Sequence, residues 1–339
     1  MNKCFFGDCR ETMRQLIDDG VKVQTCVTSP PYWGLRDYGV EGQLGLEKTL
    51  DEFIETMVDV FRLVRELLRD DGTMWVNIGD TYLAQRGSGF NGNRTRLDKE
   101  NKNITSKVKR PDYLKSKNLM LIPFHLVIAL QRDGWIVRSD IIWAKKNCMP
   151  ESVTDRPTKS HEYLFLLSKN PHYYYDADAI KEPASPESHA RYARGRGEHT
   201  KTINGAPGQK PHTFHQPKPN ERIAGVHPKA VEQGRGIKAN ESFSASVKDV
   251  VEMRNKRTVW NVPAKGYPGA HFATYPPELI EPCILAGSRV GDIVFDPFFG
   301  SGTTGEVAQN LGRQWIGCEL NPEYEVLQKN RTQQQAMAL

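Results

Sequence analysis

The tetrapeptide Ser29-Pro30-Pro31-Tyr32 brings together groups that could act on a polar ligand. Ser29 offers a hydroxyl, Pro30 a backbone carbonyl and Tyr32 an aromatic ring. Two successive prolines cannot donate hydrogen bonds to a strand ladder, so the strand predicted over Val21–Val27 ends before them. Because a carbonyl held between prolines is rigid, it is a preorganised acceptor. The tetrapeptide therefore predicts an acceptor site at the end of a strand.

A second candidate site is the glycine-rich segment 296–304, between a predicted strand and a predicted helix. Gly300-x-Gly302-x-x-Gly305 fits the dinucleotide-binding pattern, and small residues let a ligand approach the backbone and the free N–H groups of a helix. No Lys-Ser/Thr pair follows the glycines, which excludes a P-loop. Glu319 ends the next predicted strand, where a carboxylate can accept hydrogen bonds from ribose hydroxyls of any adenosine cofactor.

The order of these segments resembles that of the DNA amino-methyltransferases. Their catalytic tetrapeptide is Ser/Asp/Asn-Pro-Pro-Tyr/Phe, and their cofactor loop is Asp-Pro-Phe-x-Gly-Ser-Gly-Thr. A tetrapeptide that precedes the cofactor loop is typical of the permuted beta group. Further resembling segments are Gly7-Asp8-Cys9, 138–145, 160–165 and 271–276, where Phe272 replaces the more usual proline. The resemblance covers about residues 1–175 and 259–330.

The resemblance implies a site-specific methyl transfer from S-adenosyl-L-methionine to an exocyclic amine in double-stranded DNA, with base flipping. Two acceptors for the amine protons, the Ser29 hydroxyl and the Pro30 carbonyl, would stabilise the developing positive charge. Tyr32, beside Pro31, would stack on the flipped base. We expect N4 of cytosine, because Ser at the first position goes mostly with cytosine in the family; N6 of adenine is the alternative. The implied cofactor contacts are Asp8, Phe272, Thr274, Asp296, Pro297, Phe298, Gly300, Gly302, Thr303, Glu319 and Asn321.

Other functions remain as alternatives. An NAD-dependent dehydrogenase would leave Ser29–Tyr32 unexplained. A DNA-binding protein without activity would not need an intact tetrapeptide and an intact cofactor loop, both of which this sequence has. Methyltransferases of RNA or of protein glutamine have similar tetrapeptides, usually beginning with Asn, and the two basic insertions described below favour DNA.

Predicted strands and helices alternate, which favours a mostly parallel sheet covered on both faces. Hydrophobic periodicity predicts helices over Leu50–Arg69, Leu119–Arg132 and Thr303–Leu311, the first with a capping box at Thr49 and Glu52. The fold class expected is therefore α/β, a seven-stranded Rossmann-like methyltransferase sheet with permuted motif order. Since ligands bind beyond the carboxyl ends of such strands, the segments at 7–8, 29–32, 79–80, 296–302 and 319 should share one edge.

Two basic segments interrupt the regular pattern. Residues 84–118 hold ten Lys/Arg and three Asp/Glu, a net charge of +7, and residues 176–258 hold fifteen and ten, a net charge of +5. The whole chain carries +5, so the remainder is acidic. This contrast predicts that double-stranded DNA binds through 84–118 and 176–258. We expect a catalytic half (1–175, with the basic loop 84–118), a target-recognition region (176–258) and a cofactor-binding half (259–339).

The composition is that of a globular protein, with 38% hydrophobic and 26% charged residues in 339. No apolar run is long enough for a membrane helix, and no signal peptide is recognisable, so we expect a cytoplasmic, nucleoid-associated protein without membrane contact. Six cysteines without Cys-x-x-Cys spacing predict reduced thiols and no metal site. A homodimer and a cognate restriction endonuclease are left open as further partners.

Overall fold

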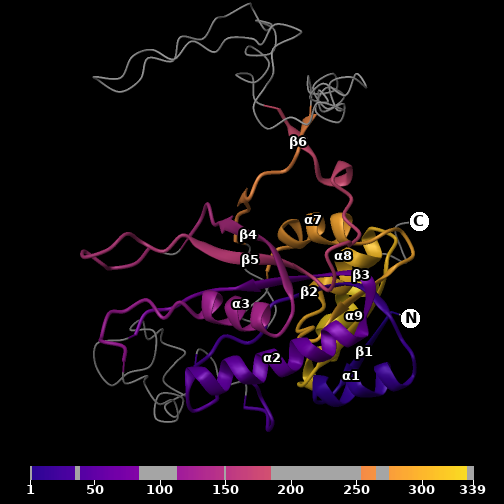
Figure 1. Cartoon of the computed structure of the whole chain (residues 1–339), viewed down its shortest axis with the longest axis horizontal. Helices are drawn as coiled ribbons and strands as arrows, with labels where there is room; N and C mark the ends of the chain where they lie inside the picture. Colours follow the sequence, from indigo (N-terminus) through magenta and orange to yellow (C-terminus); the bar gives the residue numbers. More distant parts are fainter. Residues whose placement is uncertain are drawn as a thin grey trace, which may run out of the picture. The chain divides into compact units, whose positions relative to one another are not determined.

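The computed structural model describes residues 2–34, 39–83, 113–148, 150–184, 253–264 and 275–333. Within these ranges, eight strands form a mixed sheet in the order β1-β10-β9-β2-β3-β5-β4-β8 (Figure 1). The strands are β1 (Lys3–Phe6), β2 (Val23–Thr28), β3 (Leu68–Ile78), β4 (Ile136–Ala144), β5 (His161–Ser168), β8 (Val259–Asn261), β9 (Ile293–Asp296) and β10 (Gln314–Glu319). The main helices are α1 (Cys9–Asp18), α2 (Leu50–Leu67), α3 (Ile122–Arg132), α7 (Pro277–Gly287), α8 (Thr303–Asn310) and α9 (Glu325–Gln333).

Five neighbouring strands, from β1 to β3 in the sheet order, are joined by parallel pairing, so their carboxyl ends meet at one edge. β5 runs antiparallel to both β3 and β4, which brings its amino end to the same edge as the carboxyl end of β4. The largely parallel α/β sheet is thus confirmed. The predicted number of seven strands is wrong: β8 adds an eighth beside β4, and its three residues are too few to show a periodicity.

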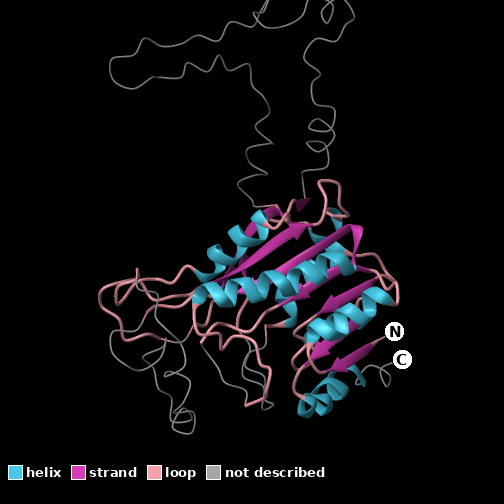
Figure 2. Ribbon diagram, turned by 60° about the horizontal axis from the view of Figure 1, so that its bottom comes forward, coloured by secondary structure: helices cyan, strands magenta, loops and turns pink. Residues whose placement is uncertain are grey.

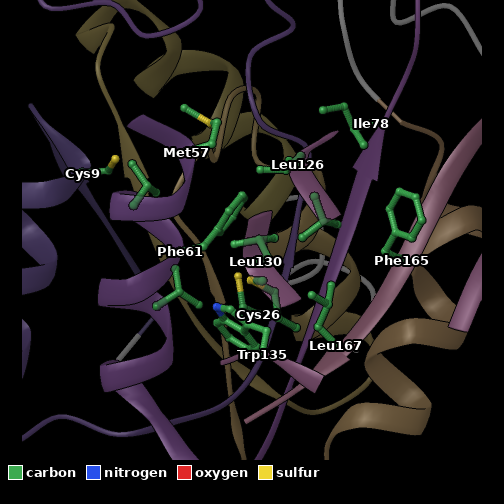
Figure 3. Packing of buried hydrophobic residues seen from close by; sticks show 14 of the residues in the cluster. Cys9, Cys26, Met57, Phe61, Ile78, Leu126, Leu130, Trp135, Phe165 and Leu167 are labelled. Atoms are coloured by element: carbon green, nitrogen blue, oxygen red, sulfur yellow. The ribbon is translucent and has the colours of Figure 1, made fainter. Parts of the chain in front are cut away.

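Helices cover both faces of the sheet (Figure 2). α1, α2 and α3 contribute to one buried cluster, in which Met57, Phe61, Leu130 and Trp135 pack together (Figure 3). α7 and α8 contribute to a second cluster, which includes Ile284 and Val307. Each fully buried side chain of this size stabilises the fold by about 1.5–3 kcal/mol.

Two helix boundaries differ from the prediction by two residues or more, and α8 ends one residue early, at Asn310. The capping box at Thr49 is present, but α2 ends at Leu67 because Leu68 already pairs with Val23 of β2. α3 begins at Ile122, three residues late, because Leu119 forms a bridge with Tyr82 and Leu121 has a left-handed backbone (φ 55°). In both cases a tertiary pairing overrides the local helical pattern.

The chain divides into two compact units, residues 1–180 with 257–339, and residues 181–256. In the second unit, β6 (Glu182–Pro183) pairs antiparallel with β7 (Met253–Arg254), and the Arg254 guanidinium donates to Glu182 at 2.9 Å. Most of the two basic segments, 84–112 and 185–252, lies outside the described residues. In the part of the chain that is described, no helix is long and apolar enough to cross a membrane.

Candidate functional site

A cavity of about 390 Å³ opens at the edge where the parallel strands end. This volume falls in the range of roughly 300–1,000 Å³ typical of small-molecule sites. It brings together most of the predicted site residues, from four separate strand ends. Those that line it are Asp8, Ser29, Pro30, Pro31, Tyr32, Pro297, Phe298, Gly300, Glu319 and Asn321.

Three other predicted residues, Asp296, Gly302 and Thr303, are not among those that line this cavity. Two more, Phe272 and Thr274, lie outside the described residues. Asp296, Gly302 and Thr303 are close in sequence to cavity residues, but the structure gives them other contacts, described next. Asp80, at the end of β3, is also not among the cavity residues. Its carboxylate accepts a hydrogen bond from the backbone N–H of Ile122, the first residue of α3, at 3.2 Å.

Asp296 is a buried anchor behind the cavity wall. Its carboxylate accepts hydrogen bonds from the hydroxyls of Thr28 (2.6 Å), Thr304 (2.6 Å) and Tyr275 (3.0 Å), and from the backbone N–H of Phe298 (3.0 Å). Burial raises its pKa, and these donors counteract that effect. Asp296 therefore connects β2, α8 and Tyr275, two residues before α7, to the glycine-rich loop.

The glycine-rich loop is shaped by two glycines and one ring. Gly300 and Gly302 have positive φ angles of 53° and 88°, and Gly302 precedes the first turn of α8. The Phe299 ring stacks on Trp315 at 4.8 Å and fills the space that a Cβ on Gly305 or Gly317 would need. Thr303, at the start of α8, accepts a hydrogen bond from Arg331 at 2.9 Å.

Glu319 closes the loop from the neighbouring strand. One carboxylate oxygen accepts from the backbone N–H of Gly300 and the other from that of Asn321, both at 2.8 Å. Burial raises its pKa, and the two N–H groups oppose that shift. An ionised carboxylate has about four acceptor positions, so Glu319, which lines the cavity, can accept further hydrogen bonds from a ligand.

Asp8 lies at the carboxyl end of β1, opposite the glycine-rich loop. It caps α1 by accepting from the Arg10 backbone N–H at 2.8 Å, and its carboxylate also receives the Arg10 guanidinium. Burial would raise the pKa of Asp8, but these hydrogen bonds and the positive charge outweigh it and lower the pKa. The carboxylate is therefore held ionised on the cavity wall.

The tetrapeptide Ser29–Tyr32 is held in place by the residues that follow it. Trp33 is buried, and its indole N–H donates to the carbonyl of Glu47 at 3.0 Å. The backbone of Gly34 donates to that of Gly45, which lies against Pro31. The segment around Gly45 also lines the cavity through Gln43 and Leu44, neither of which the sequence pattern had indicated.

A polar chain that sequence reasoning did not predict lies behind Tyr32. The Tyr32 hydroxyl donates to Glu162 at 2.7 Å, and the Lys145 ammonium binds the other oxygen of the same carboxylate. All three residues line the cavity. Lys145 and Glu162 lie in segments that resemble the family, but the resemblance gave neither residue a role. The antiparallel direction of β5, which brings Glu162 to the cavity, is the signal that could have indicated one.

The cavity offers acceptors and an aromatic ring rather than a nucleophile. Cys9 and Cys318 line it, but burial raises the pKa of Cys9 to about 12 and that of Cys318 well above its usual range, so both stay protonated near neutral pH. All six cysteines are free. Among the described ranges, no three His, Cys, Asp or Glu side chains are grouped as a metal site. Direct transfer to a bound amine fits this equipment.

Comparison with known proteins agrees with this geometry. The family model for N6/N4 DNA methylases matches residues 23–330. The type II methyltransferase M.SmaI of Serratia marcescens is 43% identical over 333 residues, 97% of this chain and 90% of that protein. M.Cfr9I of Citrobacter freundii is also 43% identical, over 97% of this chain and 87% of its own length.

Solved structures share the fold at lower identity. A DNA modification methylase of Thermus thermophilus, solved with S-adenosyl-L-methionine, superposes with a TM-score of 0.54 at 21% identity, covering 100% of this chain and 96% of that one. The cytosine-N4-specific PvuII DNA methyltransferase superposes with a TM-score of 0.55 at 16% identity, covering 97% and 85%.

Proposed function

This chain belongs to the N6/N4 DNA methylase family, and on that premise we propose that it methylates the exocyclic N4 of cytosine in double-stranded DNA. S-adenosyl-L-methionine is the methyl donor. One observation carries the proposal: Ser29, Pro30 and Tyr32 line the same cavity as Glu319 and the glycine-rich loop. A methyl group held by the loop would face an amine held by the tetrapeptide.

The residues present fit the methyl donor. The Glu319 carboxylate lines the cavity and has acceptor capacity for ribose hydroxyls, and Gly300 lines the cavity beside it. We assign the positively charged end of the donor to the side of Asp8, whose carboxylate is held ionised. Phe298 supplies an apolar wall. Bound there, S-adenosyl-L-methionine supplies an activated methyl group.

The tetrapeptide prepares the acceptor amine. An exocyclic amine is a weak nucleophile because its lone pair is drawn into the ring. In the proposed reaction, the Ser29 hydroxyl and the Pro30 carbonyl accept its two protons and stabilise the charge that develops on nitrogen. Tyr32 stacks on the flipped base, which offsets part of the cost of unstacking by about 1–3 kcal/mol.

The choice of cytosine rests on Ser29. An ionised Asp is a stronger acceptor for a developing cation than a neutral hydroxyl, and in the family Ser at this position goes mostly with cytosine. N6 of adenine is the second candidate, since the matching family model covers both kinds of enzyme. We assign duplex contact to residues 84–118 and target recognition to residues 176–258. Because several relatives are named type II methyltransferases, we also propose a cognate endonuclease in the source cell.

The test is transfer of labelled methyl from S-adenosyl-L-methionine to duplex DNA by the purified full chain. Label in duplex DNA, and none in RNA or protein, is the expected result. Label only in RNA or protein, or no transfer by a protein that binds the donor, would contradict the proposed function.

A further inference from the structure

We propose that Glu162 is the terminal proton acceptor of the site and is reached from Ser29 through the Tyr32 hydroxyl. The inference rests on the proposed function and assigns a role to Glu162, Lys145 and the hydroxyl of Tyr32, which the methyl transfer described above leaves unused. Glu162 does not touch the reacting atoms; it acts through Tyr32.

Hydrogen bonds join Tyr32, Glu162 and Lys145. The Tyr32 hydroxyl donates to Glu162 Oε2 at 2.7 Å. Ser29 lines the same cavity three residues earlier in the chain, and its side chain is one of the polar groups that lower the pKa of Tyr32 against the effect of burial. Lys145 Nζ binds Glu162 Oε1, so the carboxylate is held on its other side by a cation. An oxygen-to-oxygen path therefore leads from the tetrapeptide to an anchored carboxylate.

The fold keeps this chain in a fixed place. Glu162 lies at the amino end of β5, directly past the pairing of Ile78 with Tyr163. A Cβ on Gly79 would lie 2.8 Å from the Tyr32 ring and 3.3 Å from the Glu162 carboxylate carbon. The absence of a side chain at Gly79 thus makes room for both residues. On the neighbouring strand β4, Trp143 pairs with Glu162, and the Lys145 ammonium lies 4.4 Å from the centre of the Trp143 ring.

The weak basicity of the Ser29 hydroxyl explains why the proposed reaction needs a path to a carboxylate. Methyl transfer forms an N–C bond, breaks the S–C bond of the donor, and leaves a cationic nitrogen that must lose one proton. A carboxylate is a far stronger base than a neutral hydroxyl. We assign the proton of the amine to Ser29 Oγ, while the Ser29 proton moves to Tyr32 Oη and the Tyr32 proton to Glu162 Oε2. Glu162 ends neutral, Ser29 and Tyr32 are restored, and Lys145 keeps its charge.

The role of the Tyr32 hydroxyl can be distinguished from the stacking role of its ring. Phe occurs at this tetrapeptide position in the family that the sequence resembles, so a ring alone is enough to stack on a base. Burial raises the pKa of Tyr32 well above its usual range, with the negative charge of Glu162 as the next cause, so the phenol keeps its proton at rest. It can therefore pass a proton on without becoming a phenolate.

The experiment compares single-turnover methyl transfer by the full chain, Tyr32→Phe, Glu162→Gln and the double variant, in H₂O and in D₂O. Gln keeps an oxygen that accepts from Tyr32 but cannot hold the proton. Loss of a relay of this kind should slow the step by about 10²-fold. The double variant should be no slower than either single one, because both interrupt one path. The solvent isotope effect of the wild type should disappear in all three.

Tyr163→Phe is the matched control. It removes a phenol from the next residue of β5, which is half-buried and does not line the cavity. Its rate and isotope effect should equal those of the wild type. Donor binding, measured by calorimetry, should be unchanged in every variant; should Glu162→Gln not fold, Tyr32→Phe alone carries the same comparison.

The outcomes separate the two proposals. Wild-type transfer with unchanged rates in Tyr32→Phe and Glu162→Gln would overturn the relay and leave the proposed function standing. Additive losses with a retained isotope effect would also overturn it, since they indicate two independent structural roles. Failure of the wild type to methylate DNA would instead overturn the proposed function.

Discussion

The proposed reaction depends on the hydroxyl of Ser29. This residue lines the cavity directly after the last residue of β2. Ser29→Ala removes one acceptor that acts mainly in the transition state. By analogy with the removal of one oxyanion-hole donor, we expect turnover to fall by about 10²–10³-fold. Single-turnover transfer to duplex DNA measures this directly.

The control for Ser29→Ala is Ser139→Ala, a half-buried serine on β4 that does not line the cavity. Both variants should keep the wild-type affinity for S-adenosyl-L-methionine. A Ser29→Ala protein that binds the donor and turns over at the wild-type rate would show that the hydroxyl is not an acceptor in the reaction.

At this scale, the residues that could be predicted are those whose neighbours in sequence form a pattern, such as Ser29, Tyr32 and Glu319. Glu162 could not be predicted, because its place depends on the direction of β5. Asp296 has a structural role that the motif did not indicate. Its buried carboxylate accepts four hydrogen bonds, whereas its predicted contact with the cofactor stays a prediction.

At the scale of elements, the strand β10 and the helix α8 approach closely around Phe299. A Cβ on Gly317 would lie 2.4–2.8 Å from three carbons of the Phe299 ring, which is too close for the ring to stay. Gly317→Ala should therefore displace Phe299 and the loop that precedes α8. We expect the free energy of unfolding to fall by about 1–3 kcal/mol, as for other overpacked cores. Thermal unfolding and calorimetric donor binding, which should weaken several-fold, measure the two effects.

The matched comparison is the double variant Gly317→Ala with Phe299→Leu, in which a smaller side chain leaves room for the new methyl group. It should recover part of the lost donor affinity. If Gly317→Ala alone leaves both stability and donor binding unchanged, the close packing of Phe299 does not shape the loop.

The elements that sequence reasoning missed have physical causes. α7 carries Pro277 at its start and Pro282 inside, and proline normally argues against a helix. The strong hydrophobic period of α2 made that helix easy to predict, whereas its last residues depended on the pairing of Leu68 with β2. Local pattern thus determined the type of the long elements, and tertiary pairing decided their ends.

At the scale of the whole molecule, positive charge is concentrated in residues 84–118 and 176–258, at +7 and +5 in a chain of net charge +5. Contacts between these side chains and phosphates would release counterions, so binding should weaken steeply with salt. Neutralising Arg94, Arg96, Lys107 and Lys109 to Gln should weaken DNA binding and lower the salt slope by about 0.9 for each phosphate that is no longer neutralised. Fluorescence anisotropy between 50 and 200 mM salt, roughly the range over which such effects are large, gives both values.

Four exposed lysines of the described surface provide a charge-matched control when changed to Gln: Lys3, Lys22, Lys48 and Lys329. This variant should keep the wild-type slope. Equal slopes in both variants would show that residues 84–118 are solvated surface and do not hold the duplex.

Nucleoside mass spectrometry identifies the methylated atom and so distinguishes N4 of cytosine from every other acceptor. Duplex DNA is treated with the purified chain and labelled S-adenosyl-L-methionine, digested to nucleosides and separated. N4-methylcytosine carrying the label, and absent after treatment with Ser29→Ala, is the predicted result. Labelled N6-methyladenine alone would contradict the choice of base and leave the site assignments in place, whereas labelled 5-methylcytosine would contradict the mechanism itself.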